Sequence, residues 1–132
     1  MDISAGFFDV VFEVRRPEPT SPWPVDTAHL ARFTMGDHAL EREVLALFTA
    51  ETPRRIEAME AAACDKDWKM ATHTLKGSAR AVGAWRLATL AQDAERIGGV
   101  SDRAACARAI LSIEKESAAV EAYIMRLYPP QA

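Results

Sequence analysis

The chain has few cysteines, little excess charge and no long apolar run, and each shortage excludes a class of protein. No stretch of its 132 residues is apolar for long enough to span a membrane, and the first residues lack the basic start and apolar core of a signal peptide. The net charge of -3 and the pI of about 5.6 argue against a general nucleic-acid-binding protein, which is usually basic. No glycine-rich stretch has the spacing of a nucleotide-binding loop. We therefore expect a cytoplasmic protein that binds neither nucleic acid nor membranes.

The two cysteines, Cys64 and Cys106, lie far apart and fit no metal-ligand spacing. Each belongs to an alanine-rich stretch, "AAAC" and "AACA". We interpret both as free, buried or half-buried thiols in helices, with a disulfide as the alternative. His29 and His38 do not pair with His73 at ligand spacing either, so the sequence predicts no zinc site.

The composition, 49% hydrophobic and 27% charged, is typical of one soluble globular domain. Residues 1–25 differ from the rest of the chain. The stretch "FFDVVFEV" at 7–14 predicts a short strand, and the prolines of "RRPEPTSPWP" at 15–24 predict an extended segment. We interpret residues 1–25 as an arm, with Trp23 as a candidate anchor, and residues 26–132 as the folded domain.

Residues 26–132 have the pattern of helices separated by short loops. Asp26 is a good N-cap for a short helix at 26–33, and Asp37 for a long helix at about 38–64, which Pro53 is expected to kink or break. The predicted core stripe of the long helix consists of Leu40, Val44, Leu47, Phe48, Ile56 and Met59. Three further helices are expected at about 65–83, 84–97 and 102–127. The predicted fold is all-α: an up-down antiparallel four-helix bundle with a short N-terminal helix and the extended arm.

One predicted helix places a histidine, a lysine and a glycine on the face that its apolar pattern leaves for solvent. Its core stripe consists of Ala71, Leu75, Ser78 and Val82. At about 100° per residue, His73 lies about 200° from Leu75 and therefore faces outward. Lys69, Lys76, Gly77 and Arg80 share the outward side with His73.

This combination suits the transfer of a phosphoryl group onto the imidazole. Neutral imidazole is a good nucleophile near pH 7, and a lysine within reach stabilises the negative charge of the transferred group. Glycine in a helix costs about 1 kcal/mol relative to alanine. A partner that must approach closely explains why that cost is tolerated. The alternative is that His73 is an ordinary surface histidine.

The stretch "HTLKGSARAVG" resembles the signature of histidine-containing phosphotransfer (HPt) domains, H-x-[LI]-K-G followed by small residues and a second glycine. The matching residues are His73, Leu75, Lys76, Gly77, Ser78, Ala79 and Gly83. The resemblance extends over roughly residues 26–127 and includes "GAWRLATLAQDAERIG". It implies a four-helix bundle with one phospho-accepting histidine, which exchanges phosphate with an aspartate of a receiver domain.

The resemblance also implies residue roles. His73 is implied as the phospho-acceptor through Nε2, Lys76 as a lysine that holds the phosphoryl group, and Gly77 as the glycine that opens the docking face. Glu95 lies where the family often has Gln or Glu bonded to the other ring nitrogen, and Gln92 is the fallback for that role. The expected partner-binding residues are Lys69, Arg80, Ala84 and Arg96, although the two arginines could equally be solvated.

By the same resemblance, the partners are receiver domains of response regulators or hybrid histidine kinases. No kinase core or ATP-binding motif is visible in the sequence, so a monomeric, stand-alone phosphocarrier is expected rather than a turnover enzyme. We expect no cofactor, because Mg²⁺ would sit in the partner's aspartate pocket. Two alternatives stay open. One is an HPt-like module that docks on a kinase or response regulator without carrying phosphate. The other is an enzyme with His73 as general base, for which the sequence supplies no second convergent group.

Overall fold

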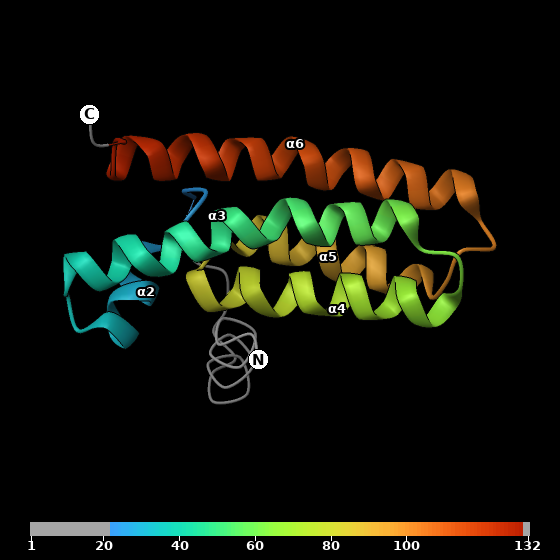
Figure 1. The fold of residues 1–132 in the computed structure, drawn as a ribbon, viewed down its shortest axis with the longest axis horizontal. Coiled ribbons are helices and arrows are strands. Elements are labelled where there is room, and N and C mark those ends of the chain that lie inside the picture. Colours follow the sequence, from blue (N-terminus) through green and yellow to red (C-terminus); the bar gives the residue numbers. More distant parts are fainter. Residues whose placement is uncertain (1–21, 131–132) are drawn as a thin grey trace.

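Residues 22–130 are described by a computed structural model, and they form five α-helices without a strand. The short helix α2 (Thr27–Thr34) precedes four longer helices: α3 (His38–Ala61), α4 (Asp65–Val82), α5 (Trp85–Ile97) and α6 (Arg103–Leu127). Figure 1 shows the four longer helices side by side along their length, with successive helices joined at alternate ends. The predicted all-α fold and helical bundle are confirmed. The strand predicted at 7–14 lies outside the described residues.

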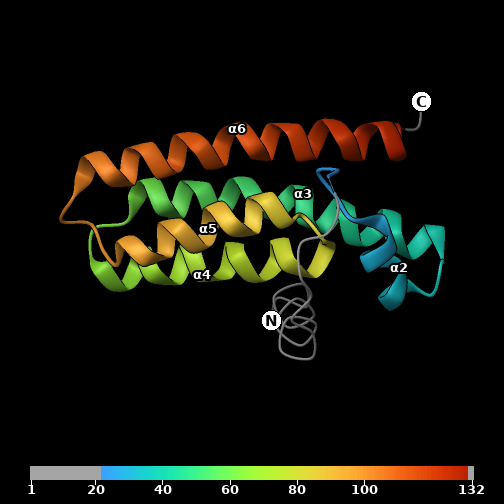
Figure 2. The ribbon, with the colours of Figure 1, turned by 180° about the vertical axis from the view of Figure 1, so that it is seen from behind.

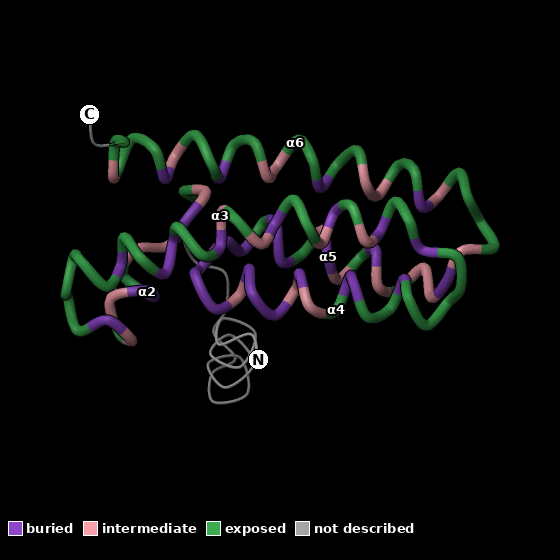
Figure 3. Tube along the Cα trace, in the orientation of Figure 1, coloured by how far each residue is buried: buried purple, intermediate pink, exposed green. Residues whose placement is uncertain are grey.

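The four long helices form a ring in which each packs against two neighbours. α4 contacts α3 and α5, and α6 closes the ring against α5 and α3. α2 packs against α3 and α4, and Figure 2 shows it from behind at one end of the bundle. Buried residues recur along the inner side of each long helix (Figure 3). The largest fully buried side chains include Trp68, Phe48, Leu45, Leu75, Leu87 and Ile113. No helix within residues 22–130 is both long and apolar enough to cross a membrane.

Aspartates fix where three of the helices begin. The carboxylates of Asp26, Asp37 and Asp102 accept hydrogen bonds from backbone amides in the first turns of α2, α3 and α6, at 3.0–3.2 Å. Each bond satisfies an amide that has no partner within its helix. The predicted starts of these helices are confirmed. α4 begins after Cys64, which provides no side-chain cap.

The helix α3 is continuous through Pro53, so of the kink or break expected there the break is wrong. Core residues lie on both sides of the proline: Phe48 is 2% exposed and Ile56 is 8% exposed. The hydroxyl of Thr52 also donates to the carbonyl of Phe48 at 2.8 Å. Because most helical stability in a protein comes from packing, a helix anchored on both sides tolerates the one amide that proline lacks.

The core stripe of α3 also differs from the predicted one. Leu40 and Leu47 are exposed, whereas Glu41 and Leu45 are buried. Glu41 can occupy a core position because both carboxylate oxygens accept hydrogen bonds, from Thr34 at 3.0 Å and from Tyr128 at 2.8 Å. Burial, together with this bond to Glu41, raises the pKa of Tyr128 to about 12. The carboxylate thus ties α2 and the end of α6 to α3.

Residues 22–25, the last part of the predicted arm, pack onto the bundle. Val25 is buried, and the Trp23 ring stacks on Tyr123 of α6 with 6.3 Å between ring centroids. The carbonyl of Pro22 accepts a hydrogen bond from Arg86 at the start of α5. Trp23 therefore contacts the bundle, although it is 61% exposed, and its role as an anchor of the arm stays a prediction. The boundary between arm and domain at residue 25 stays a prediction.

Replacement of glycine by alanine is expected to have opposite effects on stability at Gly77, within α4, and at Gly83, directly after it. Gly83 has a φ of +80°, and a Cβ there would lie 2.8 Å from the carbonyl oxygen of Asp26. Among residues 22–130, a Cβ at Gly77 would meet no heavy atom within 4 Å apart from the neighbouring backbone of its own helix. We expect Gly83→Ala to lower the free energy of unfolding by about 1–3 kcal/mol. Gly77→Ala should raise it by about 0.5–1 kcal/mol. Urea unfolding checks both changes, and shifts of the same sign would contradict this account.

Candidate functional site

The helix α4 turns His73 outward by burying the residues of its opposite face. Ala71, Leu75, Ser78 and Val82 are all buried, as predicted. The His73 side chain is 58% exposed. The core stripe therefore determines that the imidazole is accessible from solvent.

Close packing of α5 on α4 brings a carboxylate to this histidine. Ala91 and Ala94 of α5 are fully buried, and such small side chains let two helices approach closely. The indole of Trp68 in α4 donates to the carbonyl of Ala94 at 2.8 Å. This bond fixes the register of the two helices next to Glu95.

The imidazole of His73 and the carboxylate of Glu95 form a hydrogen bond between α4 and α5. The distance from Nδ1 to Oε2 is 3.1 Å. A carboxylate accepts, so Nδ1 carries the donated proton and Nε2 of the neutral ring has a free lone pair. The ring therefore presents Nε2 as its nucleophilic atom.

Lys76 and Arg80, the cations that follow His73 on α4, are also held by α5. The ammonium of Lys76 lies 2.6 Å from Oε1 of Glu95, so one carboxylate contacts both the lysine and the histidine. Arg80 donates to the side-chain oxygen of Gln92 at 2.6 Å. Of the two residues predicted to contact the imidazole, Glu95 does so, and Gln92 serves Arg80 instead.

The electrostatics of Glu95 are dominated by its two partners. Partial burial of Glu95 opposes ionisation. The hydrogen bond and charge of Lys76, followed by the hydrogen bond from His73, outweigh it and hold the pKa of Glu95 below its ordinary value of 4.5. A carboxyl whose pKa is lowered on folding stabilises the fold above its ordinary pKa, and that contribution is lost as the pH falls through the lower value. Glu95 is therefore an anion at neutral pH.

The pairing predicts how the pKa of Glu95 responds to loss of the lysine. In Lys76→Met we expect this pKa to rise, because the variant removes the stronger of the two stabilising partners. An NMR titration of the Glu95 carboxyl carbon in both proteins measures the change. An unaltered pKa would show that the ion pair does not persist in solution.

Of the remaining predicted site residues, two are exposed and two are buried. Lys69 is exposed on the His73 side of α4, and Arg96 is exposed next to Asp93, with 3.8 Å between charged groups. Gly77 has a buried backbone with open space above it. Ala84 is fully buried, so the prediction that it contacts a partner is wrong. Its amide bonds the carbonyl of Ala79 at 2.8 Å, which turns the residue inward between α4 and α5.

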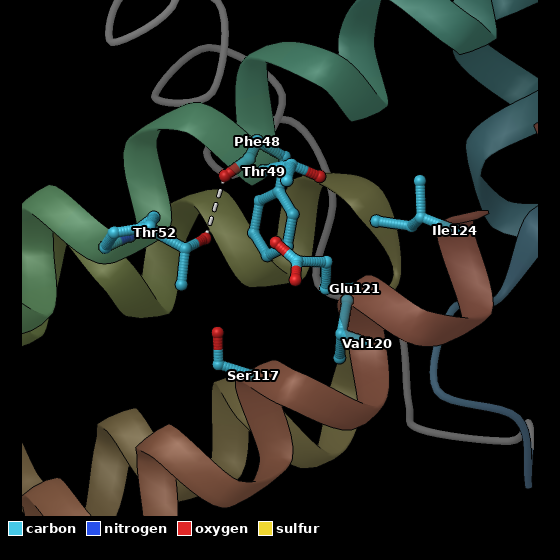
Figure 4. A pocket seen from close by; sticks show the side chains of 8 residues that line it. Phe48, Thr49, Thr52, Ser117, Val120, Glu121 and Ile124 are labelled. Carbon is cyan, nitrogen blue, oxygen red and sulfur yellow. Dashed lines mark hydrogen bonds between the residues drawn. The ribbon is translucent and has the colours of Figure 1, made fainter. Parts of the chain in front are cut away.

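Two hollows among residues 22–130 lie away from these side chains. A cavity of about 20 Å³ between α3 and α6 is lined by Phe48, Thr52, Ser117 and Glu121, among others, and the Thr52 hydroxyl bonds the Phe48 carbonyl there (Figure 4). An open groove beside it, of about 340 Å³, is lined by Glu57, Glu60, Glu114 and Glu121, among others. Neither of these two hollows includes a residue of the His73 site.

The two cysteines do not belong to the His73 site. Cys64 and Cys106 are both free thiols, as predicted. Cys106 is buried, but Cys64 is exposed and lies between α3 and α4 rather than in a helix, which corrects its predicted environment. No group of three or more His, Cys, Asp or Glu side chains within the described residues could hold a metal ion.

Comparison with known proteins gives a consistent result. The sequence model of the Hpt domain family matches residues 43–123, which include His73, Lys76, Gly77 and Glu95. The structure is similar to the crystal structure of histidine-containing phosphotransfer protein B (HptB) from Pseudomonas aeruginosa PAO1, with a TM-score of 0.68 and 20% sequence identity. The match covers 81% of this chain and 95% of that one. No curated protein matches the chain. With more than half of its length matched by the family model, the chain belongs to the Hpt domain family, the histidine phosphotransfer domains of phosphorelays.

Proposed function

We propose that this protein carries phosphoryl groups on Nε2 of His73 and exchanges them with aspartates of receiver domains in a phosphorelay. The observation that supports the proposal most directly is the hydrogen bond between Nδ1 of His73 and Glu95, which directs Nε2 of the exposed ring away from the carboxylate and leaves the lone pair of its neutral form free. We further propose that it acts as a cytoplasmic monomer without a cofactor, with Mg²⁺ bound by the receiver.

The transfer from an aspartyl phosphate proceeds by in-line attack. Nε2 of His73 donates its lone pair to phosphorus, so an N–P bond forms while the P–O bond to the aspartate breaks. The aspartate carboxylate leaves with the electron pair of that bond. The ring keeps its Nδ1 proton and gains positive charge, which the carboxylate of Glu95 stabilises at 3.1 Å.

Lys76 is proposed to serve the phosphoryl group, and Gly77 the receiver domain that approaches it. The ammonium of Lys76 lies on the histidine side of α4 and stabilises the phosphoryl oxygens. Gly77, one turn after His73, leaves open space where a side chain would stand between the ring and a receiver. Reversal of the same steps returns the phosphoryl group to a receiver.

A receiver panel tests the exchange. The protein is phosphorylated with labelled phosphoramidate, freed of the donor and mixed with single receiver domains and with their Asp→Asn variants. We expect the label to move to at least one wild-type receiver and to none of the variants. If the label enters the protein but reaches no receiver, exchange is refuted. If unphosphorylated wild type and His73→Gln also bind a receiver equally, the protein is a docking module.

A further inference from the structure

The ammonium of Lys76 is occupied in the unphosphorylated protein. It lies 2.6 Å from Oε1 of Glu95, and among residues 22–130 it has no second hydrogen-bond partner. Its side chain is only 14% exposed, whereas that of His73 is 58% exposed. The lysine is therefore held against α5 by a carboxylate before any phosphoryl group arrives.

We infer that Glu95 competes with a phosphoryl group on His73 for the ammonium of Lys76, and that this carboxylate thereby shortens the lifetime of phosphorylated His73. The inference rests on the proposed function. An ammonium already paired with one anion offers less net charge to a second anion. The carboxylate of Glu95 is hydrogen-bonded to the same ring and adds its own repulsion toward the phosphoryl oxygens.

The bond from Glu95 to the ring acts in the same direction. In hydrolysis, water attacks phosphorus, the P–Nε2 bond breaks and its electron pair returns to the ring nitrogen. Inorganic phosphate takes the protons of the water, and the ring keeps its Nδ1 proton. A ring that keeps its Nδ1 proton leaves as neutral imidazole rather than as an anion, and the Glu95 acceptor at 3.1 Å favours the protonated form from which hydrolysis proceeds. Glu95 is thus a positioning residue that keeps the phosphoryl group ready to leave.

Glu95→Gln separates these effects from the geometry, because glutamine keeps the shape and an acceptor oxygen but loses the charge. We expect phosphorylated Glu95→Gln to lose its phosphoryl group at least about twofold more slowly than wild type, the lower end of effects between residues in contact. Asp93→Asn removes an exposed carboxylate from the same helix and should leave the lifetime unchanged. Donor-free phosphoprotein followed by intact mass over time gives all three lifetimes.

A double-mutant cycle tests the competition itself. If Glu95 withholds Lys76 from the phosphoryl group, Lys76→Met should shorten the lifetime more in the Glu95→Gln background than in wild type. Lys76→Arg keeps a cation, so it should keep the part of the dependence on residue 95 that Lys76→Met removes. A variant that merely disturbed the fold would not show this dependence, and circular dichroism confirms that each variant is folded.

The outcomes separate the inference from the proposed function. If wild type takes up the phosphoryl group but Glu95→Gln loses it as fast as or faster than wild type, the inference is wrong and the proposed function stands. If the two substitutions combine additively, Glu95 and Lys76 act independently and competition is excluded. If wild type takes up no phosphoryl group on His73, the proposed function is wrong, and so is the inference that rests on it.

Discussion

Replacing His73 with glutamine is expected to abolish phosphoryl uptake from phosphoramidate altogether. Wild type should gain one acid-labile phosphoryl group, and His73→Gln should gain none. The reason is that the variant removes the nucleophilic nitrogen, and the neighbouring lysine and carboxylate cannot replace it. Glutamine is polar and fits an exposed helix position, so the fold should be retained. Intact mass before and after brief acid treatment measures the uptake.

His38→Gln is the matched control for this substitution. His38 is the other exposed histidine of the described residues, with a side chain that is 83% exposed, and it lies at the start of α3. The His38→Gln variant should take up the phosphoryl group on His73 at the wild-type rate. Uptake that persists in His73→Gln, or that disappears in His38→Gln, would show that His73 is not the acceptor.

A leucine at position 77 is expected to block receivers while sparing the small donor. The added side chain would project into open space beside His73 rather than into the bundle, and leucine is a good helix former. We expect Gly77→Leu to fold stably and to accept phosphate from phosphoramidate at close to the wild-type rate. Transfer to a receiver should fall at least about tenfold, which corresponds to about 1.4 kcal/mol of lost docking energy.

Ala122→Leu adds the same side chain at an exposed position of α6 and serves as the control. It should leave both reactions unchanged. If Gly77→Leu exchanged with receivers as fast as wild type, the face of α4 next to His73 would not be the docking face. If it lost uptake from phosphoramidate as well, the leucine would have damaged the histidine site itself.

The outward position of His73 could be predicted from sequence because it follows from one helix. Leu75 and Val82 define which side of α4 is buried, and the helical repeat then places His73 on the other side. Helix starts were predictable for the same reason, since a cap such as Asp37 acts on amides only two or three residues away. Local rules suffice where the partners are local.

The family resemblance places Glu95 ahead of Gln92 as the partner of the imidazole, but helical periodicity alone does not distinguish them, because the choice depends on the register between two helices. The two residues lie about one turn apart on α5, and either could face α4. The bond from Trp68 to Ala94 selects the register in which Glu95 meets His73. The pairing of Lys76 with Glu95 depends on the same register, and no pattern in the sequence predicts it.

Burial also departs from hydrophobicity where polar groups find partners. Glu41 is buried because Thr34 and Tyr128 donate to it, while Leu40 is left outside. No periodicity analysis assigns a glutamate to a core, since its two donors come from other parts of the chain. The buried position of Ala84 likewise depends on contacts between elements, because it reflects how α4 and α5 meet at the turn.

The most direct test of the account is an NMR experiment on the uniformly ¹⁵N-labelled phosphoprotein that detects which nitrogen is bonded to phosphorus. We expect a ³¹P–¹⁵N coupling to Nε2 of His73, with a proton on Nδ1 that is held by Glu95. Phosphorus on Nδ1, or on any other residue, would contradict it. The hydrogen bond between Nδ1 and Glu95 would then not be what selects the reacting nitrogen.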